Sequence, residues 1–125
     1  MKVLIVDDNE SFLMLFELYA ENYPEYTFFY GESGEEALKI LESENGRGIS
    51  LIVTDVRMPT LSGIELSREV KEKYPDIPIM LITGLELSYF SEDDLKSSAK
   101  LLNKDIGCDG IIKEIKLFFD SQGKQ

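Results

Sequence analysis

The stretch Ile49-Ser50-Leu51-Ile52-Val53-Thr54-Asp55 decides the fold. It is nearly all apolar until its last two residues, which is typical of a central parallel strand that is buried on both faces. Two other runs, Lys2–Val6 and Pro78–Ile82, have the same character and stop in the same way, at Asp7 and at Thr83. The sequence therefore predicts a buried parallel sheet whose strands end in polar side chains.

The rest of the chain alternates between strand-like and helix-like patterns. Strands are predicted at Val3–Val6, Tyr26–Tyr30, Ile49–Val53, Ile79–Ile82 and Gly110–Ile112. Helices are predicted over Glu10–Asn22, from Ser33, from Ser62, from Ser91 to about Leu102, and as a short last helix around Ile115–Phe119. This alternation predicts one α/β domain over residues 1–125: a doubly wound, five-stranded parallel sheet in the order 2-1-3-4-5, as in flavodoxin-like three-layer sandwiches.

Local signals support the helix starts. Asn9 is a candidate N-cap, and serines followed three residues later by an acid predict caps at Ser33, Ser62 and Ser91. Helical spacing predicts inward faces made by Phe12, Leu15, Phe16 and Tyr19 in the first helix, and by Leu95, Ala99 and Leu102 in the fourth.

Composition excludes several classes of function. The chain has no histidine and one cysteine, Cys108, which rules out an internal disulfide, imidazole metal ligands and a phosphohistidine on this chain. A net charge of −11 argues against nucleic-acid binding by this domain. No apolar stretch approaches 20 residues, and acids follow the short N-terminal apolar run, so we expect no membrane span, no signal peptide and a cytoplasmic location.

Polar residues at the predicted strand ends form a candidate site. Asp7 and Asp8 follow the first strand, Asp55 the third, Thr83 the fourth and Lys113 the fifth. Each has an ordinary explanation alone: a turn or cap for the acids, a strand position for the threonine, a solvated surface for the lysine. At one edge of a parallel sheet, however, they supply oxygen ligands for Mg²⁺, and a hydroxyl and a positive charge for a phosphoryl group.

In this order the motifs resemble the receiver domain of bacterial two-component response regulators. The resemblance covers the whole chain and rests on Val-Asp-Asp-Asn (6–9), Thr-Asp-Val-Arg-Met-Pro (54–59) with Gly63, Ile-Thr-Gly (82–84) and Lys113. It implies that Asp55 is the phosphoacceptor and that Asp8 and Asp55 ligate Mg²⁺, assisted by Asp7 and by the backbone carbonyl of Arg57. It also implies that Thr83 and Lys113 bind phosphoryl oxygens.

Three features depart from the family pattern. Glu114 follows Lys113 where the family usually has proline, and Gly110 stands where it usually has an aromatic switch residue. The 30 residues from Thr83 to Lys113 exceed the usual spacing by about two helical turns. We therefore expect any phosphate-dependent movement to be expressed through the segment that follows Thr83, residues 84–103.

The resemblance implies a signalling switch and not a turnover enzyme. Its partners would be a sensor histidine kinase or phosphotransfer protein and a downstream effector or output domain. Two alternatives stay open: a receiver-like binding module that works without phosphate, and a Mg²⁺-dependent aspartyl-phosphate hydrolase. The hydrolase class needs a second aspartate two residues after its nucleophile, and that position is Arg57 here.

Overall fold

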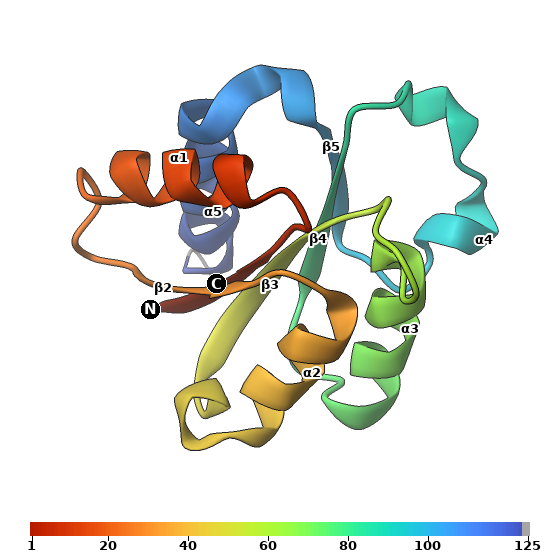
Figure 1. Cartoon of the computed structure of the whole chain (residues 1–125), viewed down its shortest axis with the longest axis horizontal. Helices are drawn as coiled ribbons and strands as arrows, with labels where there is room; N and C mark the ends of the chain where they lie inside the picture. Colours follow the sequence, from red (N-terminus) through yellow and green to blue (C-terminus); the bar gives the residue numbers. More distant parts are fainter. Residues whose placement is uncertain (124–125) are drawn as a thin grey trace.

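The computed structural model describes residues 1–123 as a single parallel sheet covered by helices on both faces (Figure 1). The strands are β1 (Lys2–Val6), β2 (Thr27–Gly31), β3 (Ile49–Asp55), β4 (Ile79–Thr83) and β5 (Lys100–Asn103). The helices are α1 (Glu10–Ala20), α2 (Gly34–Glu42), α3 (Gly63–Lys73), α4 (Glu92–Leu95) and α5 (Gly107–Gln122). The strand order β2-β1-β3-β4-β5 confirms the predicted doubly wound topology.

Two apolar clusters hold the three layers together. On one face, α1 and α5 pack against the sheet around Phe16, Val53 and Ile111, all fully buried. On the other face, α2 and α3 pack around Ala37 and Leu66. Among residues 1–123, no helix has the length and apolar content needed to cross a membrane.

The predicted caps are present. The Asn9 side chain accepts a hydrogen bond from the backbone N–H of Phe12, and Ser33 accepts one from Glu36. Ser62 and Ser91 form complete capping boxes, with Glu65 and Asp94 respectively. Each of these four helices begins at the residue after its predicted cap, so the short-range signals located the helix starts correctly.

The prediction for the last third of the chain is wrong. Gly110–Ile112 is not a strand but lies inside α5, and the last helix is 16 residues long. Its isoleucines continue the helical spacing of Ile115, Phe118 and Phe119 toward the N-terminus, so one buried stripe runs along α5. A short apolar run does not by itself distinguish a strand from a buried helical face.

The true fifth strand lies in the predicted fourth helix. That helix ends at Leu95, and β5 pairs with β4 in parallel, with Leu101 opposite Leu81 and Asn103 opposite Thr83. Leu102 is buried as predicted, but from a strand, in the same apolar cluster as Cys108 of α5. Pairing with β4 satisfies the backbone of this stretch and outweighs the helical spacing of its leucines.

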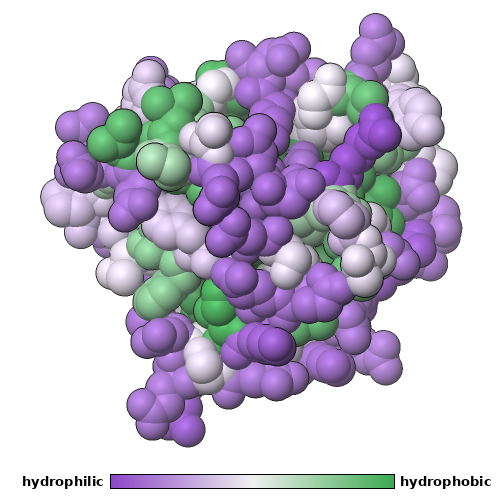
Figure 2. All heavy atoms as spheres, viewed as in Figure 1, coloured by the Kyte–Doolittle hydropathy of each residue, from purple (hydrophilic) through white to green (hydrophobic). Residues whose placement is uncertain are grey.

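The inward face predicted for α1 is partly wrong. Phe16 and Leu13 are buried, whereas Leu15 is 48% and Tyr19 39% exposed. Apolar residues of α1 lie all around its axis, so their spacing does not identify the one face that is buried. Figure 2 shows the result, hydrophobic side chains amid a polar surface at the upper left, where α1 runs.

Candidate functional site

The predicted acids meet at the carboxyl edge of the sheet. Asp7 follows β1 and is fully buried, Asp55 ends β3 and is 8% exposed, and Asp8 is exposed. One carboxylate oxygen from each of the three lies within 4.8 Å of the others. Strand pairing causes this convergence, because β1 and β3 are neighbours in register and end side by side.

Backbone contacts hold these acids in place. The N–H of Asn9 donates to Asp7 Oδ1 at 2.9 Å, which fixes the turn between β1 and α1. The N–H of Gly63 donates to the Val56 carbonyl at 2.9 Å, and a Cβ on Gly63 would lie 2.2 Å from the Asp55 carbonyl oxygen. Only glycine therefore allows the start of α3 to approach the end of β3 this closely.

The electrostatics of the cluster favour a bound cation. Burial, followed by the negative charge of Asp7, raises the pKa of Asp55 to about 6. Within residues 1–123, Asp7 Oδ2 is buried without a hydrogen-bond partner. Two buried carboxylates and an exposed third supply hard oxygen ligands, and the residues present therefore fit a Mg²⁺ ion.

Thr83 lies beside this cluster on the next strand. It ends β4, is 1% exposed, and its Oγ1 accepts a hydrogen bond from the N–H of Leu85 at 3.1 Å. A pocket of about 240 Å³ joins the side chains of Asp55, Thr83 and Lys104, and its other lining residues are Arg57, Gly84 and Leu85. Arg57 is exposed on the loop after β3.

The structure does not bring Lys113 to the site. Lys113 lies on α5, its side chain is 67% exposed, and its Nζ lies 3.1 Å from Asp109 Oδ2 one helical turn away. The hydrogen bond to Asp109 raises the pKa of Lys113. Lys113 was predicted to follow the fifth strand, but that stretch is part of a helix. The predicted position of Lys113 at the site is therefore wrong.

Lys104 is the lysine that reaches the acids, and sequence reasoning missed it. It follows β5, and its Nζ lies 2.7 Å from Asp7 Oδ2, although not in hydrogen-bonding geometry. Its positive charge opposes the rise in the pKa of Asp55. The signal was present in the sequence: Leu101-Leu102-Asn103 is an apolar run with a polar ending, and Lys104 is only 21 residues after Thr83.

A second, larger pocket adjoins the first. It has a volume of about 600 Å³, shares Arg57 and Leu85 with the smaller pocket, and is also lined by Tyr89 and Phe90. Tyr89 is 74% exposed. The loop after β4 therefore forms one wall of both hollows.

Comparison with known proteins agrees with this geometry. The response regulator receiver domain family matches residues 3–116. The chain is 31% identical to the response regulator receiver protein CpdR of Brucella abortus, over 93% of the chain and 95% of that protein. It is 26% identical to the transcriptional regulatory protein DegU of Brevibacillus brevis over 93% of the chain, and spans about half (49%) of the length of that relative.

A solved structure extends the comparison. The response regulator TrrA of Thermotoga maritima, determined in complex with Mg²⁺ and BeF, superposes with a TM-score of 0.71 at 29% identity, covering 92% of this chain and 96% of that one. The chain therefore belongs to the response regulator receiver domain family.

Proposed function

We propose that the chain is a phosphorylation-activated switch of a two-component system, with Asp55 as the phosphoacceptor. The observation that carries the proposal is the position of Asp55: a buried carboxylate at a strand end, beside Asp7 and Asp8 and in one pocket with Thr83 and Lys104. A carboxylate so placed attacks phosphorus and forms an acyl phosphate. Because the chain has no histidine, a phosphohistidine donor belongs to a partner, a sensor histidine kinase or phosphotransfer protein.

In the transfer step, an Asp55 oxygen forms a bond to phosphorus while the P–N bond of the donor phosphohistidine breaks. The carboxylates of Asp7, Asp8 and Asp55 and the carbonyl of Arg57 would hold Mg²⁺, which disperses charge on the transferring oxygens. The Thr83 hydroxyl donates to one phosphoryl oxygen. Lys104 takes the role first expected of Lys113 and neutralises another.

The output follows from what Thr83 already contacts. Its Oγ1 accepts from the N–H of Leu85, and the Leu85 carbonyl accepts from the side chain of Asn103 at 3.4 Å. A hydroxyl that turns toward a phosphoryl oxygen disturbs both contacts. The change therefore enters the segment between β4 and β5 and reaches a downstream effector or output domain there.

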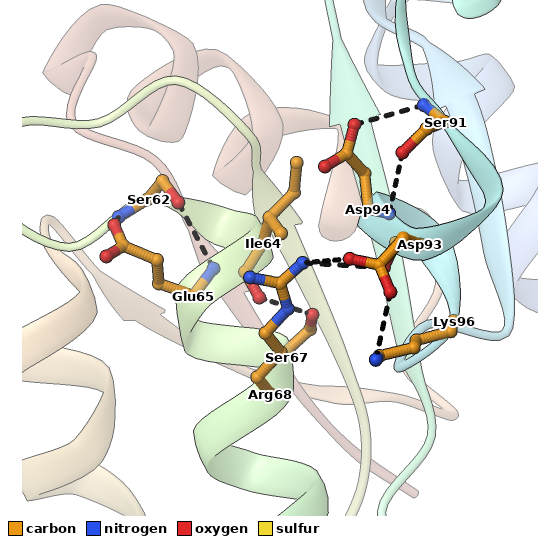
Figure 3. Close-up of polar contacts among 9 residues, drawn as sticks. All are labelled: Ser62, Ile64, Glu65, Ser67, Arg68, Ser91, Asp93, Asp94 and Lys96. Carbon is orange, nitrogen blue, oxygen red and sulfur yellow. Dashed lines mark hydrogen bonds and ion pairs between the residues drawn. The ribbon is translucent and has the colours of Figure 1, made fainter.

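This segment is held weakly on its outer side. Figure 3 shows Arg68 of α3 reaching Asp93 of α4, with Lys96 on the same carboxylate. The Arg68 and Asp93 side chains are 43% and 72% exposed, and their closest atoms are 3.5 Å apart. Exposed ion pairs of this kind contribute little to stability, so this contact does little to prevent α4 from responding to the site.

The two alternatives have less support. A phosphate-independent binding module would not need the acids, the threonine and a lysine to converge, and Lys104 supplies that lysine in place of Lys113. A hydrolase would need a second acid two residues after Asp55, and that position holds Arg57. We therefore propose that the domain catalyses its own phosphorylation and does not turn over a free substrate.

The test is labelling by a small acyl phosphate or a phosphohistidine donor in the presence of Mg²⁺. Wild type is expected to take up one acid-stable, base-labile acyl phosphate, and Asp55→Asn none. Asp109→Asn, which changes an exposed aspartate on α5, is the matched control and should label like wild type. Uptake by Asp55→Asn at the wild-type rate would refute the assignment.

A further inference from the structure

The ammonium of Lys104 lies between two different partners. On one side is Asp7 Oδ2 at 2.7 Å, and on the other is the ring of Phe12, whose centroid is 4.4 Å from Nζ. A cation within about 6 Å of an aromatic face is attracted by the ring quadrupole. The Lys104 side chain is 24% exposed and would have some freedom to move in solvent. The contacts with Asp7 and Phe12 restrict that movement.

The ring of Phe12 is itself held in place. The N–H of Phe12 donates to the Asn9 side chain, and the N–H of Asn9 donates to Asp7 Oδ1. The Phe12 ring also packs against Phe16, with centroids 6.2 Å apart. The first turn of α1 therefore couples the ring and the Asp7 carboxylate through one capping residue, and both face the same ammonium.

We propose that Phe12 is a positioning residue that acts through Lys104 on the phosphoryl group. The inference rests on the proposed function. A lysine has four flexible side-chain bonds, and fixing them at the moment of phosphoryl binding costs conformational entropy. The Phe12 ring holds the ammonium beforehand at the rim of the pocket that Asp55 and Thr83 also line, which reduces this cost.

The main test is a double-mutant cycle with beryllofluoride and Mg²⁺ as the probe, with the dissociation constant measured by NMR titration. Phe12→Leu keeps apolar bulk and removes the π face, and we expect it to weaken binding about fivefold, equivalent to about 1 kcal/mol. Phe12→Tyr keeps a ring and should bind within about twofold of wild type. In a Lys104→Met background, Phe12→Leu should have no further effect.

Either of two results in this cycle would overturn the proposal. An unchanged affinity in Phe12→Leu, or an equal loss with and without Lys104, leaves Phe12 as packing for α1 only. Phe12→Met also lacks the ring and replaces Phe12→Leu if that variant does not fold. Failure of wild type to bind beryllofluoride would instead refute the proposed function, so the two failures are distinguishable.

A second measurement needs neither Mg²⁺ nor beryllofluoride. The ε-methylene protons of Lys104 should be shifted upfield by the ring current of Phe12, whereas those of the exposed Lys113 should not. Phe12→Leu should abolish this shift and Phe12→Tyr should restore it. An ordinary, unshifted Lys104 signal in wild type would overturn the proposal.

Discussion

Lys104 and Lys113 make a matched pair for testing which lysine belongs to the site. Both are replaced by methionine, which keeps the apolar stem and removes the charge. Lys104→Met leaves the fully buried Asp7 carboxylate beside Asp55 without its counter-charge. Lys113→Met removes only an exposed pair on α5, whose side chains are 67% and 46% exposed.

The expected costs differ by more than the error of the measurement. Breaking a buried charge pair from one side costs about 3–5 kcal/mol, and the 24% exposure of Lys104 reduces this to about 2–3 kcal/mol. An exposed pair contributes less than about 1 kcal/mol. With a urea m value of about 1–3 kcal/mol per M, Lys104→Met should lower the unfolding midpoint by roughly 0.7–3 M.

The assay is urea unfolding followed by circular dichroism at pH 7, first in chelator and then in excess Mg²⁺. The loss in Lys104→Met should be large in chelator and smaller in Mg²⁺, because the bound cation gives Asp7 a new partner. Lys113→Met should stay close to wild type in both conditions. If Lys104→Met cost no more than Lys113→Met in chelator, the contact between Lys104 and Asp7 would have no energetic role and our argument would be wrong.

Three further predictions concern the acids and the output segment. The pKa of Asp55, about 6, lies above its unfolded value of about 4, so the folded state holds an extra proton in between and this group lowers stability as the pH rises through that window. Asp55→Asn should therefore stabilise the metal-free protein by about 3 kcal/mol at pH 8 and by little at pH 4, as judged by urea midpoints. Millimolar Mg²⁺ should raise the melting temperature of wild type, and Asp8→Asn should largely remove that rise; a wild-type melting temperature indifferent to Mg²⁺ would count against the metal site. Amide shifts caused by beryllofluoride with Mg²⁺ should extend beyond the pocket mainly into residues 84–103, and a response centred on residues 10–22 would exclude this output segment.

The acids and the threonine could be predicted because strand ends determine their positions. A buried parallel strand is recognisable from its continuous apolar run, and the residue that ends the run must lie at the carboxyl edge of the sheet. Asp7, Asp55 and Thr83 each follow such a run, and the structure places all three at that edge. Their proximity could therefore be predicted without any knowledge of side-chain contacts.

Lys104 was missed because β5 is an edge strand with a weak signature. Its apolar run is only two residues long, Leu101 and Leu102, and only Leu102 is buried, so the run is too short to distinguish this strand clearly. Ile111 and Ile112 form a stronger apolar pair, but they owe their burial to one face of α5. Spacing was the better guide, since a lysine 30 residues after Thr83 required a helix longer than the family pattern allows.

The corrected register changes which residues can transmit a signal. Counted back from Lys104 in the same way as from Lys113, the position of the aromatic switch falls on Leu101 and no longer on Gly110. Leu101 is partly buried against the α3-side cluster, which also includes Phe90 and Leu95. An aliphatic side chain packed there has no hydroxyl and no flat ring to exchange between two positions.

In the proposed mechanism, the backbone of Leu85 is the physical link between the site and the segment formed by residues 84–103. Its N–H is bound to Thr83, its carbonyl to Asn103, and its side chain lines both pockets. A rotation of the Thr83 hydroxyl acts on this one residue before it acts on anything farther along the loop. Because α4 beyond it is four residues long, and only the partly buried Leu95 and an exposed ion pair to α3 are seen to hold it, we expect the displacement to meet little resistance. The signal should then appear as a change in the shape of the larger pocket beside Tyr89 and not as the movement of an aromatic ring in β5.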